Sequence, residues 1–413
     1  MTLFRKLSRS PAVWVAPLFW FFVWDLASSE KRFADPYYGV STTGAALYPI
    51  FAIVSVSAAC GAWEGGRLRR GQVWQSSPVR QRIIVAVDAL GPVFLVGFLS
   101  LAVSCLATTG NLANIFDTGS LVMLLFAAVL ISLYALIGFA IGCLIPSFIA
   151  VPVSLIGSYL WMGIPGSLEI MWLRHLTGQL TDIPGIGQRI SYEALLAPVL
   201  LTASLALSIL VLIALRTRMH FRVTISILIA FSGIGGSYSI VSDWGPQTPL
   251  EKEKLTGVCI KDNGILSCLP REYSSHLPIF EETAHQVVED LQVFGIARPD
   301  KVEYEILSSE SDGVTWKVFS YPGQPTEEMI SEISRGAFSL DGNCEIDRAG
   351  DGARKSAIYA WLALTAGADS QYIGYLYEPE AVSIAQNIRS LSTPEQTEWY
   401  TAQISHYAHC SAS

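Results

Sequence analysis

Few residues of this chain have the types and spacing that catalysis requires. Glu281 and His285 lie one helical turn apart with His276 nearby, and His406 and His409 lie close to the end of the chain. Zinc hydrolases use tighter patterns such as H-E-x-x-H, and serine hydrolases place their nucleophile in G-x-S-x-G. Neither pattern occurs in the sequence. We therefore expect no enzymatic activity from this chain and no metal centre at these histidines.

Four cysteines, Cys259, Cys268, Cys344 and Cys410, lie in the polar second part of the chain. They contain no C-x-x-C pair, which argues against zinc, and their even number favours disulfides in an oxidising compartment. Asn263-Gly264 between two alternating runs predicts a two-residue hairpin turn. The register of that turn puts Cys259 opposite Cys268, with Cα atoms about 4.5 Å apart. By elimination, Cys344 is expected to pair with Cys410.

A basic segment from Trp63 to Arg82 carries a different kind of chemistry, which is electrostatic. It contains one acid, Glu64, and five arginines, which are Arg67, Arg69, Arg70, Arg80 and Arg82. Long apolar runs flank it on both sides. Hydrocarbon excludes such a segment, and short Lys/Arg-rich loops stay on the cytoplasmic side of a membrane.

The composition of the chain indicates the kind of domain that holds this basic segment. The chain has 413 residues, of which 51% are hydrophobic and only 15% are charged, below the roughly 25% of soluble domains. The formal charge is +5 up to Asp243 and −13 from Trp244 onward, which together give the net charge of −8. We expect a basic, apolar transmembrane domain over 1–243 and an acidic extracytoplasmic domain over 244–413, whose acidity favours cationic partners such as basic peptides.

About seven apolar runs are long enough to act as membrane spans. They cover about 11–27, 43–63, 83–107, 120–143, 148–162, 194–215 and 223–241. The segment 163–191 is broken by prolines and glycines, and it dips into the membrane or lies along its outer surface. There, Arg174, His175 and Asp182 are expected to pair with one another or to line a cavity. The fold class is a polytopic α-helical membrane protein with a small α+β C-terminal domain.

The charges of the connecting segments predict an orientation. With the N-terminus inside, cytoplasmic segments hold 11 Lys/Arg residues and the short outer segments hold 4. Because positive loops stay inside, we expect a cytoplasmic N-terminus and an extracytoplasmic C-terminal domain.

The basic segment resembles that of permease (transmembrane) subunits of type-2 ABC exporters. The residues that carry this resemblance are Glu64, Arg67, Arg70, Gly71, Ser77, Pro78, Val79 and Arg80. The run ISLYALIGFAIGCLIPSFIAVPVSLIGSYL looks like two adjacent spans of that family, joined by a tight turn. The resemblance covers about 1–215, and it implies a multi-pass protein of the bacterial plasma membrane.

The resemblance also implies a role for the basic segment as a short, surface-exposed helix that couples the spans to a separate ABC ATPase. The coupling residues implied are Glu64, Arg67, Arg70, Gly71, Trp74, Pro78 and Arg80. No P-loop occurs in the chain itself, so any ATP hydrolysis belongs to another chain, and no cofactor or nucleic acid is expected. The partners implied are that ATPase, the lipid bilayer, and a second permease in a homodimer or heterodimer.

Two alternatives remain open from the sequence. The arginines of the basic segment also suit a plain loop that fixes topology and touches lipid head groups. The whole chain also suits a non-transporting membrane protein, in which the outer domain is a sensor or binding module and the spans are its anchor.

Periodicity predicts the elements of the C-terminal domain. Helices are expected over 278–294, 325–338, 356–366, 379–391 and 394–409, and strands over 301–308 and 313–321. Thr326 and Thr393 are expected to cap two of these helices. Residues 245–254 are expected to form a linker.

Overall fold

The computed structural model describes residues 10–73, 82–109, 116–214, 218–307, 314–338 and 351–408. The chain divides into two compact units, Met1–Glu253 and Lys254–Ser413. The boundary falls after Glu253 rather than at Asp243, because the strand that precedes Glu253 pairs within the first unit.

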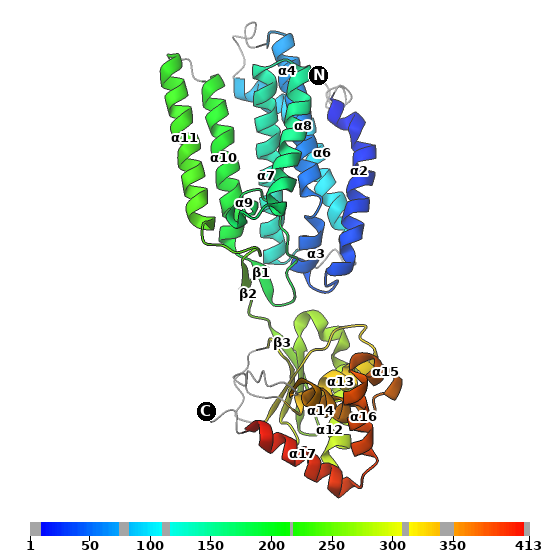
Figure 1. Cartoon of the computed structure of the whole chain (residues 1–413). Coiled ribbons are helices and arrows are strands. Elements are labelled where there is room, and N and C mark those ends of the chain that lie inside the picture. Colours follow the sequence, from blue (N-terminus) through cyan, green and yellow to red (C-terminus); the bar gives the residue numbers. More distant parts are fainter. Residues whose placement is uncertain are drawn as a thin grey trace. The chain divides into compact units, whose positions relative to one another are not determined.

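The first unit is a bundle of long apolar helices (Figure 1). Its main helices are α2 (Pro11–Glu30), α3 (Gly39–Ala46), α4 (Ile50–Arg70), α6 (Arg82–Thr108), α7 (Thr118–Leu144), α8 (Ser147–Gly163), α10 (Tyr192–Ala214) and α11 (Met219–Val241). Six of them are long and apolar enough to cross a membrane. A seventh span arises if α3 and α4, which bend by 48° at their junction, count as one. The structure thus holds the expected number of candidate spans.

The helices run up and down, so their connections gather at two ends of the bundle (Figure 1). One end holds the start of α2, the end of α4, the turn between α7 and α8, and the start of α11. We call this the basic end, because the arginines at the end of α4 lie there. The opposite end holds α3, the last part of the broken segment 163–191 and the short strands β1 and β2.

The turn between α7 and α8 follows directly from its sequence. Ile145 precedes Pro146, and a residue before proline is pushed out of the helical conformation. Ile145 accordingly has φ −118° and ψ 161°, and α8 begins again at Ser147. This confirms the tight turn expected at Pro146 and Ser147.

Helices α4 and α7 pack through two facing glycine pairs. Gly61 and Gly65 of α4 lie against backbone carbonyls of α7, and Gly138 and Gly142 of α7 lie against those of α4. A Cβ atom on Gly138 would lie 1.9 Å from the Ala58 carbonyl oxygen. Small residues spaced four apart allow such backbone contact between membrane helices. The two helices therefore form a closely packed pair.

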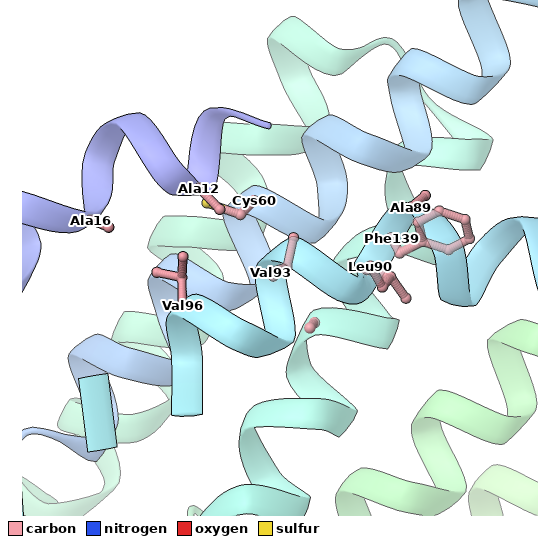
Figure 2. Packing of buried hydrophobic residues seen from close by; sticks show 9 residues of the cluster. Ala12, Ala16, Cys60, Ala89, Leu90, Val93, Val96 and Phe139 are labelled. Atoms are coloured by element: carbon pink, nitrogen blue, oxygen red, sulfur yellow. The ribbon is translucent and has the colours of Figure 1, made fainter. Parts of the chain in front are cut away.

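A hydrophobic cluster joins this pair to its neighbours. Figure 2 shows it: α2 contributes Ala12 and Ala16, α4 contributes Cys60, α6 contributes Ala89, Leu90, Val93 and Val96, and α7 contributes Ala135 and Phe139. All nine side chains are buried. Leu68, near the end of α4, packs against the same cluster.

The broken segment consists of short elements rather than a further span. They are η3 (Ile164–Ser167), α9 (Met171–Arg174) and β1 (Gln188–Ile190). Strand β1 pairs with β2 (Leu250–Lys252) in an antiparallel ladder. The linker expected over 245–254 is therefore wrong, because its second half is a strand of the first unit.

The second unit contains a four-stranded sheet in the order β3-β4-β5-β6. Its strands are β3 (Gly257–Asp262), β4 (Ile265–Pro270), β5 (Lys301–Tyr304) and β6 (Thr315–Val318). The β3–β4 pair is antiparallel, and the other two pairs are parallel. Helix α12 (Leu277–Gln292) connects β4 to β5, and it buries Phe280, Val287 and Leu291 completely.

The predicted hairpin is confirmed. Cys259 pairs with Cys268 in the β3–β4 ladder and forms a disulfide with a Cα–Cα distance of 4.2 Å. Asn263 and Gly264 both have positive φ, 43° and 90°, as a two-residue turn of the Asn-Gly kind requires. Cys344 and Cys410 lie outside the described residues.

The remaining helices are α13 (Thr326–Gly336), α14 (Asp351–Thr365), α15 (Ser370–Leu376), α16 (Pro379–Arg389) and α17 (Thr393–Ala408). With η4 (Arg271–His276), which precedes α12, they complete the α+β unit. Helix α15 was not expected from the sequence. The two threonine caps are wrong. Thr326 is the first residue of α13, and Pro325 is its N-cap. At α17, Ser392 precedes the helix and donates both its backbone N–H and its hydroxyl to the Glu395 carboxylate, which gives one half of a capping box.

Candidate functional site

The end of α4 carries the residues for which the sequence predicts a coupling role. Helix α4 does not stop at Trp63 but continues to Arg70, so Glu64, Arg67 and Arg70 belong to the same helix as the apolar residues before them. Arginines in a last helical turn complement the negative end of the helix dipole, which favours this extension. Gly71 closes the helix by donating its N–H to the Arg67 carbonyl oxygen at 3.0 Å.

Glu64 is the buried centre of this site. Its side chain is 0% exposed. The Ser10 hydroxyl donates to its Oε1 at 3.0 Å, and the Arg67 guanidinium lies 2.7 Å from its Oε2. A charge buried without a partner costs several kcal/mol, so the pair with Arg67 is what permits a carboxylate here.

Arg70 forms the second connection. Its Nη1 donates to the Ser147 hydroxyl at 2.5 Å, and its guanidinium lies 5.5 Å from the centre of the Trp63 ring. Gly66 permits this contact, because a Cβ atom there would lie 2.0 Å from Ser147 Oγ. The end of α4 thus touches the first residue of α8.

We call Ser10, Glu64, Arg67, Arg70 and Ser147 the α4 node. Its contacts fasten three places in the chain to one another: the start of α2, the end of α4, and the α7–α8 turn. Displacement of the end of α4 is therefore resisted by, and passed on to, the helices that begin there.

Fewer residues of the basic segment are exposed than the sequence predicts. A coupling helix is expected to be surface-exposed, but Glu64 is buried and Leu68 is half-buried against the bundle core. Arg69, Arg70 and Gly71 are exposed. Trp74, Pro78 and Arg80 lie outside the described residues. Glu64 thus belongs to the anchor of the segment rather than to a contact surface.

The two serines of the α4 node were not singled out by sequence reasoning. Ser10 occupies the N-cap position of α2, yet its hydroxyl bonds to Glu64 rather than to its own helix. Ser147 follows Pro146 at the start of α8. Both serines stand next to a proline at a helix start, which is the one signal that was available in the sequence.

At the opposite end of the bundle, the three polar residues of the broken segment do not pair with one another. Arg174 donates to the Pro246 carbonyl oxygen at 3.0 Å. The Nε2 atom of His175 lies 2.8 Å from the Gly245 carbonyl oxygen. Asp182 accepts from the backbone N–H of Thr248 at 2.7 Å. These side chains instead hold residues 245–248, the stretch that leads into β2.

The histidines of the second unit form no metal site among the residues that the structure places. His285 lies 3.0 Å from the Asn263 amide and 3.6 Å from the Glu289 carboxylate, and His276 is buried separately. Across the described ranges, no group of three or more His, Cys, Asp or Glu residues has the geometry to hold a metal ion.

Comparison with known proteins adds one finding. The profile of a family described as a domain of unknown function, DUF7224, matches residues 267–410, which lie within the second unit. No curated protein and no solved structure matches the chain.

Proposed function

We propose that the chain is the membrane-spanning subunit of an ATP-driven exporter of the ABC type, coupled to a separate ATPase through the segment 64–82. The observation that carries this proposal is the α4 node. A coupling segment must transmit force, and its base is fastened by Glu64 and Arg70 to two further places in the bundle.

The exposure of the arginines supports the same role. Arg69 and Arg70 are both exposed at the basic end, and Arg69 forms no ion pair with any residue that the structure describes. A plain topogenic loop needs only positive charge, and it has no use for a buried carboxylate that fixes its start. A docking segment needs such a carboxylate at its base, because a contact surface must be held in one orientation to bind a partner tightly.

The orientation of the chain follows from charge. The basic end would face the cytoplasm, where the ATPase resides, in a bacterial plasma membrane. An odd number of spans then places the second unit outside. The Cys259–Cys268 disulfide supports this placement, because such bonds persist in oxidising compartments. Pairing with a second permease, identical or related, would complete the pathway.

A second candidate function is a membrane-anchored sensor or binding module. One observation favours it: residues 254–413 form a compact unit of their own, with a separate core around α12 and the sheet. Such a unit suits independent recognition of a partner. Under this hypothesis the end of α4 needs no partner of its own.

Co-purification of the tagged full chain from its native host distinguishes the two functions. The exporter proposal expects a P-loop ATPase in the wild-type complex, identified by mass spectrometry, and its loss from Arg69→Glu. Arg218→Glu is the matched control, because Arg218 is exposed at the start of α11 and lies outside the segment. Cysteine-labelling of both variants must show unchanged topology. If the wild type carries no ATPase, or if Arg69→Glu retains it fully, the coupling proposal fails.

A further inference from the structure

A cavity of about 250 Å³ lies at the end of the bundle opposite the α4 node. It is enclosed by α3, the first turns of α7 and α10, and strand β1, all within the first unit. The residues that line it are Val40, Thr118, Gly119, Val122, Met123, Arg189, Ile190, Tyr192, Leu195 and Glu253. An engineered apolar cavity of about 150 Å³ holds a benzene molecule, so this one has room for a slightly larger compound.

The inner wall of the cavity is apolar and fixed. Val40, Met123 and Leu195 are at most 6% exposed, so their positions are set by the packing of three helices. Tyr38 stabilises the rim, because its hydroxyl lies 2.8 Å from both the Gln188 carbonyl oxygen and the Glu253 carboxylate. Pre-formed pockets with apolar walls and a few placed polar groups are typical of small-molecule sites.

The two charged residues at the rim are not paired with each other. The Arg189 guanidinium donates two hydrogen bonds to Glu251 Oε2, at 3.0 Å and 2.7 Å, and it lies 4.9 Å from the centre of the Tyr192 ring. Glu253 also interacts electrostatically with Arg189 but accepts its hydrogen bond from the neutral Tyr38 hydroxyl. The cavity lining thus holds one cation and one anion, Arg189 and Glu253, but both guanidinium hydrogen bonds go to Glu251, which lies outside the lining. Glu253 itself forms no ion pair within 4 Å with any residue that the structure describes.

We propose that this cavity binds a small amphipathic cation, with its apolar body against Val40, Met123 and Leu195 and its ammonium group at the Glu253 carboxylate. An ammonium group donates charge-assisted hydrogen bonds to a carboxylate, and these are the stronger kind. An anion of the same size would be repelled by the Glu253 carboxylate, which forms no close ion pair among the described residues. The site stands whether or not the chain is coupled to an ATPase, because binding requires no nucleotide.

Three probes of nearly equal size test the inference on the full chain in lipid nanodiscs. They are benzylammonium, benzyl alcohol and benzoate, whose head groups are positive, neutral and negative. Saturation-transfer NMR against empty nanodiscs measures binding to the protein alone. Benzylammonium should bind saturably and about tenfold more tightly than the alcohol, as a charge-assisted hydrogen bond implies, and benzoate should not bind.

Variants locate the binding. Glu253→Gln should weaken benzylammonium about tenfold, whereas the control Glu193→Gln, an exposed carboxylate that does not line the cavity, should leave it unchanged. Val122→Phe should fill the cavity and abolish binding of both benzylammonium and benzyl alcohol. Val153→Phe is its control, since Val153 is 51% exposed on α8. Leu195→Phe provides a second filling variant from another wall if Val122→Phe does not fold.

Three outcomes would overturn the inference. The first is equal binding of all three probes, and the second is unchanged benzylammonium binding in a folded filling variant. The third is a phospholipid retained by the purified protein in native mass spectrometry and lost from Val122→Phe, which would make the cavity a lipid site.

Discussion

The hydroxyl of Ser10 donates a 3.0 Å hydrogen bond to the completely buried carboxylate of Glu64. The two residues are 54 positions apart, and their contact fastens the start of α2 to the end of α4. Because Arg67 neutralises the same carboxylate and Arg70 reaches Ser147, the base of the basic segment is part of the bundle rather than a loop attached to it.

Removing Glu64 should therefore destabilise the bundle. Glu64→Leu removes the acceptor of the Ser10 hydroxyl and the partner of Arg67. Because Arg67 is 42% exposed and stays solvated, the cost is about 1.5–3 kcal/mol, that of a hydrogen bond to a charged group. We expect a large fall in thermal stability in detergent, measured by a fluorescence melt. Glu193→Leu is the control, because Glu193 is exposed in the first turn of α10. Equal melting of the two variants would show that the buried pair does not hold the helices together.

The glycine contacts of α4 and α7 make a second prediction. Gly138→Ala places a Cβ atom 1.9 Å from the Ala58 carbonyl oxygen, so the helices must separate. Overpacking of this kind costs about 1–3 kcal/mol. Gly157→Ala in α8 is the matched control, because its Cβ would meet no atom within 4 Å, and alanine should stabilise that helix by up to about 1 kcal/mol. The melting temperatures of the two variants should move in opposite directions. A rise for both would show that helix propensity outweighs the glycine packing at Gly138 and would contradict the close contact.

The disulfide makes a third prediction. Alkylation of the unfolded, non-reduced full chain should leave Cys259 and Cys268 unmodified in a peptide map. The double variant Cys259→Ser/Cys268→Ser should lose about 2–4 kcal/mol of stability in the second unit, as short disulfide loops typically contribute. Modification of either cysteine without prior reduction would contradict the pairing. The same map tests the expected pairing of Cys344 with Cys410.

His276 should make the second unit less stable in acid. Burial lowers the pKa of His276 below its ordinary value, and its Nε2 has no hydrogen-bond partner among the described residues. The unfolded chain then binds more protons than the folded one at pH values between the folded pKa and about 6.5, the ordinary histidine pKa. The stabilising contribution is present above that range and falls as the pH drops through it. Melts from pH 7.5 to 5 should show a steeper loss for the wild type than for His276→Phe, and His220→Phe should behave like the wild type. Parallel curves for the wild type and His276→Phe would refute this.

The sequence predicted the candidate spans well, because a long apolar run is a strong signal. The tight turn at Pro146 and the hairpin at Asn263-Gly264 were also predictable, since both depend on local backbone chemistry. The far end of α4 was misjudged because the span ending near Trp63 and the short basic helix after it were expected as two elements, whereas α4 runs without a break from Ile50 to Arg70. Arginines are good helix formers, and near a C-terminus they favour the helix.

Other features of the fold could not be predicted, because they depend on contacts between residues that are far apart in the sequence. Strand β2 exists because β1 lies beside it, although the two are some 60 residues apart in the chain. The burial of Glu64 depends on Ser10 and on the approach of α2. The glycine pairs at 61/65 and 138/142 were visible in the sequence, but their spacing alone does not say which helices meet.

The central claim is that the segment after α4 couples the bundle to an ATPase. The most direct measurement is the rate of ATP hydrolysis by the co-purified ATPase after reconstitution with the full chain in nanodiscs. We expect the wild type and Arg218→Glu to change that rate to the same extent. Arg69→Glu should leave the rate at that of the isolated ATPase. An Arg69→Glu chain that folds, keeps its topology and changes the rate as fully as the wild type would contradict the account.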